Sequence, residues 1–83
     1  MINLVKITIL SDNIVEKPSL LAEHGFSTLI ETEKLNILFD TGQGFCLKHN
    51  AEHLNVSLTS INKLVISHAH YDHTAGIKEI LRK

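Results

Sequence analysis

The stretch SHAHYDHTAG, residues 67–76, carries three histidines and one aspartate within six positions. It directly follows an apolar run, so the backbone there is still near extended and the side chains of His68 and His70 point to the same side. As the chain curls into the next element, Asp72 and His73 turn toward a neighbouring point. Imidazole combined with carboxylate suits zinc, iron or manganese better than calcium, which prefers oxygen ligands. The spacing therefore predicts two adjacent metal sites.

A second pair of histidines lies in HNAEH, residues 49–53, and fits the H-x-x-E-H pattern of inverted zinc proteases. That chemistry needs a long buried helix and a further acidic ligand. This segment is instead bounded by Gly44 and Asn55 and has the composition of a solvated face. We therefore interpret His49 and His53 as surface residues rather than metal ligands.

Three further side chains receive structural interpretations. Cys46 is expected to be a small buried hydrophobe, because nothing nearby in the sequence would lower its pKa enough to make it reactive. Tyr71 is expected to pack rather than to catalyse. His24 precedes a glycine, which favours a place in a turn; the alternative is that His24 lines the mouth of the metal site.

Composition limits the remaining classes of function. The chain has 83 residues, 43% of them hydrophobic, which makes one small unit whose core needs a metal or a partner surface for stability. Its single cysteine excludes an internal disulfide, and with no signal peptide in MINLVKITIL it indicates the cytoplasm. Eight basic and nine acidic residues without a basic cluster argue against nucleic acid. No apolar run is long enough to cross a membrane.

The first half of the chain reads as three strands. Residues 3–11 alternate apolar and polar side chains, as a half-buried strand does, and residues 12–25 form a long loop. Residues 26–32 and 35–40 are two β-rich runs joined by a tight hairpin. We expect these three strands to be antiparallel.

The second half delivers the histidine motif. Residues 45–54 predict a helix, and residues 62–67 form a nearly unbroken apolar run, as expected of a strand covered on both faces. Thr74 is expected to cap a last helix, which the sequence leaves unfinished. We interpret residues 1–83 as one partial domain whose C-terminal part is missing. The helical side chains expected in the core are Phe45, Leu47, Ala51 and Leu54.

The motif SHAHYDHTAG resembles the H-x-H-x-D-H signature of the metallo-β-lactamase superfamily, and NILFDTGQG resembles that superfamily's preceding Asp-Thr-Gly motif. With EHGFSTLIE, the two are similar to the branch that contains the dihydropterin-linked ribofuranosylaminobenzene phosphate synthases. The resemblance runs from Ile7 to Gly76. It implies an α+β fold: the N-terminal portion of a metallo-β-lactamase αββα sandwich, with mostly antiparallel strands and a helix before and after the last strand.

The same resemblance implies roles for the motif residues. His68 and His70 would bind a first divalent cation, and Asp72 and His73 a second. Zinc is the expected metal, with iron or manganese as alternatives. The two cations would share a hydroxide, oriented by Asp72 as the catalytic residue, that attacks a small-molecule substrate, which the branch suggests is phosphorylated. Asp40 would support a ligand or the motif loop by a hydrogen bond, or else stabilise the turn that follows it.

The resemblance also shows what this chain lacks. The family completes both metal sites with residues well downstream, whereas this sequence ends ten residues after His73. We therefore expect a metal-dependent hydrolase in the complete protein and no activity from these residues alone. Two alternatives stay open: a non-catalytic metal-binding half-domain that self-associates or pairs with a complementary chain, and an iron-dependent redox protein of the same fold.

Overall fold

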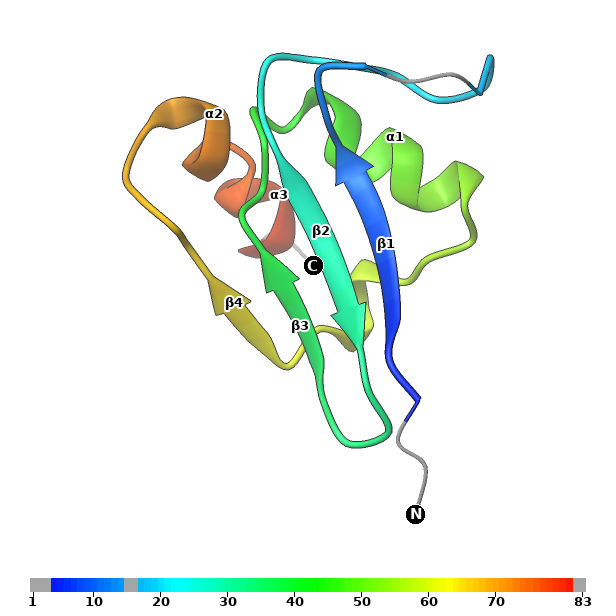
Figure 1. Cartoon of the computed structure of the whole chain (residues 1–83). Coiled ribbons are helices and arrows are strands. Elements are labelled where there is room, and N and C mark those ends of the chain that lie inside the picture. The colour runs from blue at the N-terminus through cyan, green and yellow to red at the C-terminus, as the bar shows by residue number, and fades with distance from the viewer. Residues whose placement is uncertain (1–3, 15–16, 82–83) are drawn as a thin grey trace.

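Four strands form one mixed sheet, in which the spatial order β1-β2-β3-β4 is also the order along the chain (Figure 1). The computed structural model describes residues 4–14 and 17–81. β1 pairs antiparallel with β2, and β2 with β3, whereas β3 and β4 run parallel. The strands are β1 (Lys6–Ser11), β2 (Ser27–Glu31), β3 (Asn36–Phe39) and β4 (Lys63–Val65).

The helices lie between and after the last two strands. α1 (Phe45–His53) and the short 3₁₀ helix η1 (Leu58–Ser60) form the crossover from β3 to the parallel β4. α2 (Tyr71–Thr74) and α3 (Ile77–Leu81) follow β4. α1 and α3 both lie behind the sheet in Figure 1. No helix among the described residues is long and apolar enough to cross a bilayer.

The core fills the space between the sheet and these two helices. Leu29, Leu38 and Leu64 are opposed across β2, β3 and β4, so one row of leucines faces the helices. Burying such side chains supplies the main driving force for folding. The predicted antiparallel arrangement of the first three strands and the hairpin between β2 and β3 are confirmed. The buried hydrophobic cluster comprises Leu10, Leu29, Leu38, Leu47, Ala51 and Ile80.

The opposite face of the sheet is apolar and uncovered by the described residues. Ile7 and Ile9 on β1 are 63% and 45% exposed, although the alternation in residues 3–11 predicted a half-buried strand with these side chains on its buried face. Ile7 lies opposite Ile30, and that residue opposite Ile37. On the same face, Phe39 of β3 lies opposite Val65 of β4, and Val65 is also exposed. We call the residues Ile7, Ile9, Ile30, Ile37, Phe39 and Val65 the open sheet face.

Several local predictions differ from the structure. The apolar run 62–67 forms a strand of only three residues at the sheet edge, not one covered on both faces. Thr74 is the last residue of α2 rather than a cap, because its backbone N–H and hydroxyl both donate to the His70 carbonyl. Phe45 is exposed at the start of α1, and Tyr71 is exposed at the start of α2; neither packs as expected.

Candidate metal centre

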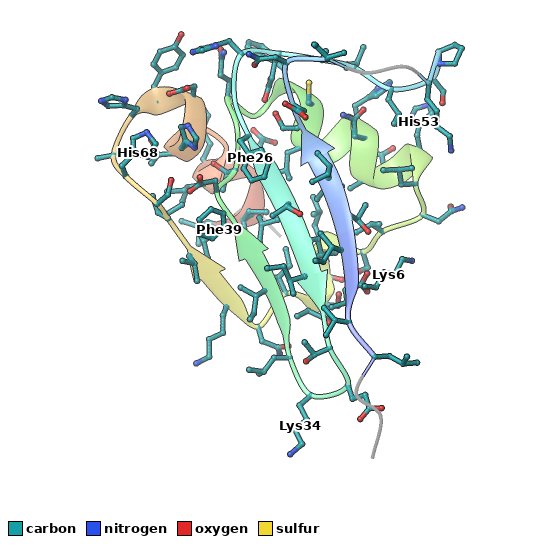
Figure 2. The ribbon with its side chains drawn as sticks, in the orientation of Figure 1. Lys6, Phe26, Lys34, Phe39, His53 and His68 are labelled. Carbon is teal, nitrogen blue, oxygen red and sulfur yellow. The ribbon has the colours of Figure 1, made fainter. Side chains whose placement is uncertain are left out.

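The histidine motif lies at the edge of the sheet where β3 and β4 end. Because the two strands are parallel, their carboxyl ends meet, which brings Asp40, directly after β3, next to Ser67 and His68, after β4. Figure 2 shows His68 at this end of the sheet, beside α2. Residues almost thirty positions apart in sequence are thus neighbours. The histidine motif follows the end of a strand, as predicted.

Asp40 is the centre of the hydrogen-bond network beneath the motif. Its side chain is buried, and its backbone adopts the left-handed region with φ of 59°. The Ser67 backbone N–H donates to Oδ1 at 2.7 Å, and the Ser67 hydroxyl donates to Oδ2 at 2.7 Å. His73 Nδ1 donates to Oδ2 at 2.6 Å. One carboxylate therefore fixes both ends of the motif.

These contacts keep Asp40 ionised. Burial by itself raises the pKa of the Asp40 carboxyl, but the hydrogen bonds from the Ser67 backbone and hydroxyl outweigh it, together with the hydrogen bond and charge of His73. The pKa consequently lies below its ordinary value of 3.8. A carboxylate with this many donors accepts and does not donate.

The network also sets the tautomers of two imidazoles. Because the Asp40 carboxylate accepts from His73 Nδ1, that nitrogen carries the proton. The single hydroxyl hydrogen of Ser67 points to Asp40, so in the 2.9 Å contact between Ser67 Oγ and His68 Nδ1 the imidazole is the donor. In the neutral form of each imidazole, Nε2 of His68 and of His73 is therefore the nitrogen that carries a free lone pair. Such a lone pair is what a metal ion binds.

The motif side chains gather around His68. Its ring centroid lies 4.2 Å from that of His73 and 4.7 Å from that of His70. Asp72 Oδ2 lies 3.5 Å from His73 Nε2. Within residues 4–14 and 17–81, however, no group of three or more His, Cys, Asp or Glu side chains is arranged to hold a metal ion. The structure brings the four predicted ligands together as neighbours, not as a closed cage.

The Asp-Thr-Gly turn after β3 anchors the backbone of the motif. The Thr41 backbone N–H and hydroxyl donate to the His73 carbonyl at 2.8 and 2.9 Å. The Gly76 N–H donates to the Thr41 hydroxyl oxygen at 3.0 Å. A Cβ on Gly76 would lie 2.9 Å from the Thr41 Cβ, so a larger residue there would separate the two segments. Asp40 thus both supports a histidine and begins the turn, which satisfies both roles considered for it.

His24 lies at the rim of the site. Its Nε2 is 3.3 Å from Asp72 Oδ2, and its side chain is 70% exposed. The Phe26 backbone N–H donates to the Asp72 carbonyl at 3.4 Å, so the turn that contains His24 packs on α2. His24 is therefore a turn residue and a neighbour of the motif at once.

The second histidine pair lies elsewhere. His49 Nε2 contacts the Ser19 carbonyl oxygen at 2.9 Å, and His53 Nδ1 donates to the His49 carbonyl at the same distance. The two rings stack on each other. Figure 2 shows His53 on the opposite side of the molecule from His68. Both histidines make the structural contacts of an ordinary helix surface.

Cys46, at the start of the same helix, is buried as predicted. Burial, and to a smaller extent the nearby Glu23 carboxylate, raises the pKa of its thiol to about 12. Since the thiolate is the reactive form, Cys46 is no nucleophile in the folded chain.

Ser67 is the site residue that sequence reasoning did not single out. The available signal was its place directly before His68, at the end of an apolar strand. A hydroxyl there can reach both the following imidazole and a carboxylate on the neighbouring strand end. Recognising it requires knowing that β3 and β4 are adjacent and parallel, which the local pattern does not specify.

Comparison with known proteins agrees with the motif. A family model described as the metallo-beta-lactamase superfamily matches residues 21–83. An uncharacterized protein of Methanocaldococcus jannaschii is 42% identical over 76 residues, covering 90% of this chain and 29% of that protein. The 7,8-dihydropterin-6-methyl-4-(beta-D-ribofuranosyl)-aminobenzene-5'-phosphate synthase of the same organism is 39% identical over 67 residues, covering 75% of this chain and 23% of the synthase.

Solved structures agree as well. Tm1679, described as a metal-dependent hydrolase of the beta-lactamase superfamily, superposes with a TM-score of 0.71 at 35% identity, covering 86% of this chain and 25% of the hydrolase. The class B3 di-zinc metallo-beta-lactamase LRA-12 from an Alaskan soil metagenome gives a TM-score of 0.57 at 32% identity, covering 71% of this chain and 25% of the enzyme. The chain thus spans about a quarter of the length of the relatives it matches. On sequence and fold together, it belongs to the metallo-β-lactamase superfamily of metal-dependent hydrolases.

Proposed function

We propose that this chain supplies half of the ligands of a two-metal hydrolytic site. In this proposal His68 and His70 bind one divalent cation, and Asp72 and His73 bind the second. The observation that carries it is the network on Asp40, which engages Nδ1 of His68 and of His73 and so leaves Nε2 of each ring as the nitrogen available to a cation. The rings of His70 and His73 lie 4.7 and 4.2 Å from that of His68, so the proposed ligands are close neighbours. Imidazole and carboxylate are donors that zinc, iron and manganese accept, which supports the proposal.

The chemistry follows from this arrangement. A bound divalent cation lowers the pKa of water to about 7 and polarises the acyl or phosphoryl group to be cleaved. Asp72 has a carboxylate oxygen beside His73 Nε2, so it can bind a cation and also orient the attacking water by accepting its hydrogen bond. Asp40 and Ser67 hold the imidazoles in place, which strengthens metal binding.

The remaining ligands would come from another polypeptide segment. A catalytic zinc generally takes three protein ligands and a water, whereas each proposed site has two from the His/Asp motif here. The relatives are about four times as long as the matched region. We propose that a complementary segment covers the open sheet face and brings those ligands to the rim of the site.

We propose a phosphorylated small molecule as the substrate. One relative is a synthase whose name describes a 5'-phosphate product. A pair of cations suits a phosphate ester because they neutralise its charge as the bond breaks.

Metal binding by the purified chain tests the proposal. We expect zinc to bind weakly in calorimetric titration, and His68→Ala or His70→Ala to weaken that binding at least about tenfold. His49→Ala, a histidine outside the site, serves as the matched control and should leave the affinity unchanged. Equal losses from His49→Ala and His68→Ala would contradict the proposed ligands.

One observation favours a second candidate, a non-catalytic metal-binding half-domain. The described residues form no closed group of three ligands, whereas a catalytic zinc generally takes three protein ligands and a water. Elemental analysis together with an assay on p-nitrophenyl phosphate separates the candidates. Bound zinc or manganese with turnover supports the hydrolase, bound zinc without turnover supports the half-domain, and bound iron supports the redox protein of the same fold.

A further inference from the structure

We propose that Tyr71 determines substrate specificity, and that its ring stacks on an aromatic group of the phosphorylated substrate. This inference rests on the proposed function and narrows the substrate class to phosphate esters that carry an aromatic ring. Tyr71 lies in the His/Asp motif between the proposed ligands His70 and Asp72, and neither proposed metal site uses its side chain.

The Tyr71 side chain is available to a ligand. Tyr71 is 63% exposed. Within residues 4–14 and 17–81, its ring contacts no other aromatic ring and its hydroxyl makes no hydrogen bond. Exposure alone is common for single apolar side chains on a protein surface. The position of Tyr71 beside the proposed metal ligands is what points to a substrate.

The first turn of α2 holds the backbone of Tyr71 in place. The N–H groups of His73 and Thr74 donate to the His70 carbonyl at 3.0 and 3.1 Å. The Ala75 N–H donates to the Tyr71 carbonyl at 2.9 Å. The ring therefore projects from a fixed turn, and placing it against a ligand restricts only the two torsions of its own side chain.

Helix geometry directs this ring toward the imidazoles of the motif. Consecutive side chains on a helix point about 100° apart, and those of Asp72 and His73 point inward, since they are only 15% and 19% exposed. Long helical side chains lean toward the helix N-terminus, which for Tyr71 is the side of His68 and His70. The rings of these two histidines lie 4.7 Å apart, and Figure 2 shows His68 beside α2. Tyr71 therefore flanks the proposed ligands.

This position suits the ester group of a bound phosphate. In the proposed function His70 and Asp72 bind different cations, and Tyr71 is the residue between them. A phosphate bound to both cations is therefore close to Tyr71, and an aromatic group one ester oxygen away is within reach of its ring. Aromatic rings attract each other in offset or edge-to-face arrangements, with centroids about 4.5 to 7 Å apart. An aliphatic ester offers no such contact.

Binding of two phosphate esters to the zinc-loaded chain tests the assignment. Phenyl phosphate and glycerol phosphate share the phosphate, and only the first carries an aromatic ring. Tyr71 is the only tyrosine in the sequence, so proton NMR can follow its ring signals without overlap from another tyrosine. We expect phenyl phosphate to bind more tightly than glycerol phosphate and to shift these signals upfield, because stacked rings shield each other.

Substitutions separate the ring from the hydroxyl. Tyr71→Ala should weaken phenyl phosphate binding by about threefold to tenfold and leave glycerol phosphate binding unchanged. Tyr71→Phe keeps the ring, so its affinity for phenyl phosphate should stay within about twofold of the wild type. Leu4→Ala removes a side chain of similar exposure, 71%, from the segment before β1, and as the matched control should change neither affinity.

The two esters also separate failure of this inference from failure of the proposed function. If both esters bind and Tyr71→Ala retains the wild-type affinity for phenyl phosphate, only the role of Tyr71 is wrong. The same holds if Tyr71→Ala weakens both esters equally. If neither ester binds the zinc-loaded chain, the proposed phosphorylated substrate is wrong, and this inference with it. Circular dichroism verifies folding of the variants, and the upfield shift in the wild type decides the matter if Tyr71→Ala does not fold.

Discussion

At the scale of single residues, the motif is organised by the Asp40 carboxylate, whose two oxygens accept hydrogen bonds from Ser67 and His73. Asp40 binds His73 directly and reaches His68 through the Ser67 hydroxyl. The two imidazoles thereby have Nδ1 engaged and Nε2 facing away from the network. In the proposed metal site, an imidazole that is already oriented loses less freedom on binding, so we expect the network to contribute to affinity without touching the ion.

Ser67→Ala tests this arrangement. Without the hydroxyl, His68 Nδ1 loses its acceptor and either tautomer becomes accessible, so zinc affinity should fall by about tenfold to a hundredfold. Calorimetric titration of zinc measures the change. Ser67→Thr keeps the hydroxyl and should stay close to the wild type. If the Ala and Thr variants bound zinc equally, the hydroxyl would have no part in positioning His68.

At the scale of elements, the loop between β1 and β2 is tied to the start of α1 by Glu23. Gly44 precedes α1 in a left-handed conformation and has no side chain to cap the helix. Glu23 performs that task from the loop: its carboxylate accepts from the Gln43 N–H at 2.9 Å and the Cys46 N–H at 3.3 Å. The Ser11 hydroxyl donates to the same carboxylate at 2.7 Å. One side chain therefore joins β1, the loop and the helix.

Glu23→Ala should lower the free energy of unfolding by about 2 kcal/mol, since it removes a helix cap and leaves donors without an acceptor. Urea unfolding followed by circular dichroism measures the loss. Glu52→Ala, an exposed glutamate on the same helix, is the control and should change stability by less than about 0.5 kcal/mol. Similar stabilities of the two variants would show that Glu23 does not cap α1.

The strands and helices also show which structural features can be predicted from the sequence alone. The alternation around Ile7 predicts a strand, and the hairpin and the histidine motif are local signals that lie where expected. Local patterns could not show that Ile7 and Ile9 face no helix, because that depends on which side α1 crosses. The places of Ser67 and His24 beside the motif depend on contacts between distant segments. The predicted cap at Thr74 is wrong because its hydroxyl donates backward to the His70 carbonyl and does not cap the next helix.

At the scale of the whole molecule, one face of the sheet packs against the helices to form the core. The other face is the open sheet face. Exposed aliphatic side chains gathered on one surface are typical of an interface. Ile7, Ile9 and Val65 are 63%, 45% and 43% exposed. We expect the isolated chain to associate with itself through this surface when no complementary segment covers it.

The double change Ile7→Glu and Ile9→Glu should abolish that association, because burying two carboxylates in an apolar interface is costly. Sedimentation velocity should show a concentration-dependent oligomer for the wild type and a monomer for the variant. Lys34→Glu, in the hairpin away from this face, is the charge-changing control and should still associate (Figure 2). A wild-type chain that stays monomeric at high concentration would contradict the expectation.

The order of the strands has a consequence for biosynthesis. Within the described residues, each strand pairs only with strands adjacent to it along the chain, so when a new strand leaves the ribosome, the strand it pairs with has already been synthesised. The sheet can therefore grow in one direction, by addition of each new strand to the exposed edge of the one before. β1, β2 and β3, with Asp40 at the end of the third, can assemble before His68 has been synthesised. The imidazoles would then arrive at a carboxylate that is already in place to receive them.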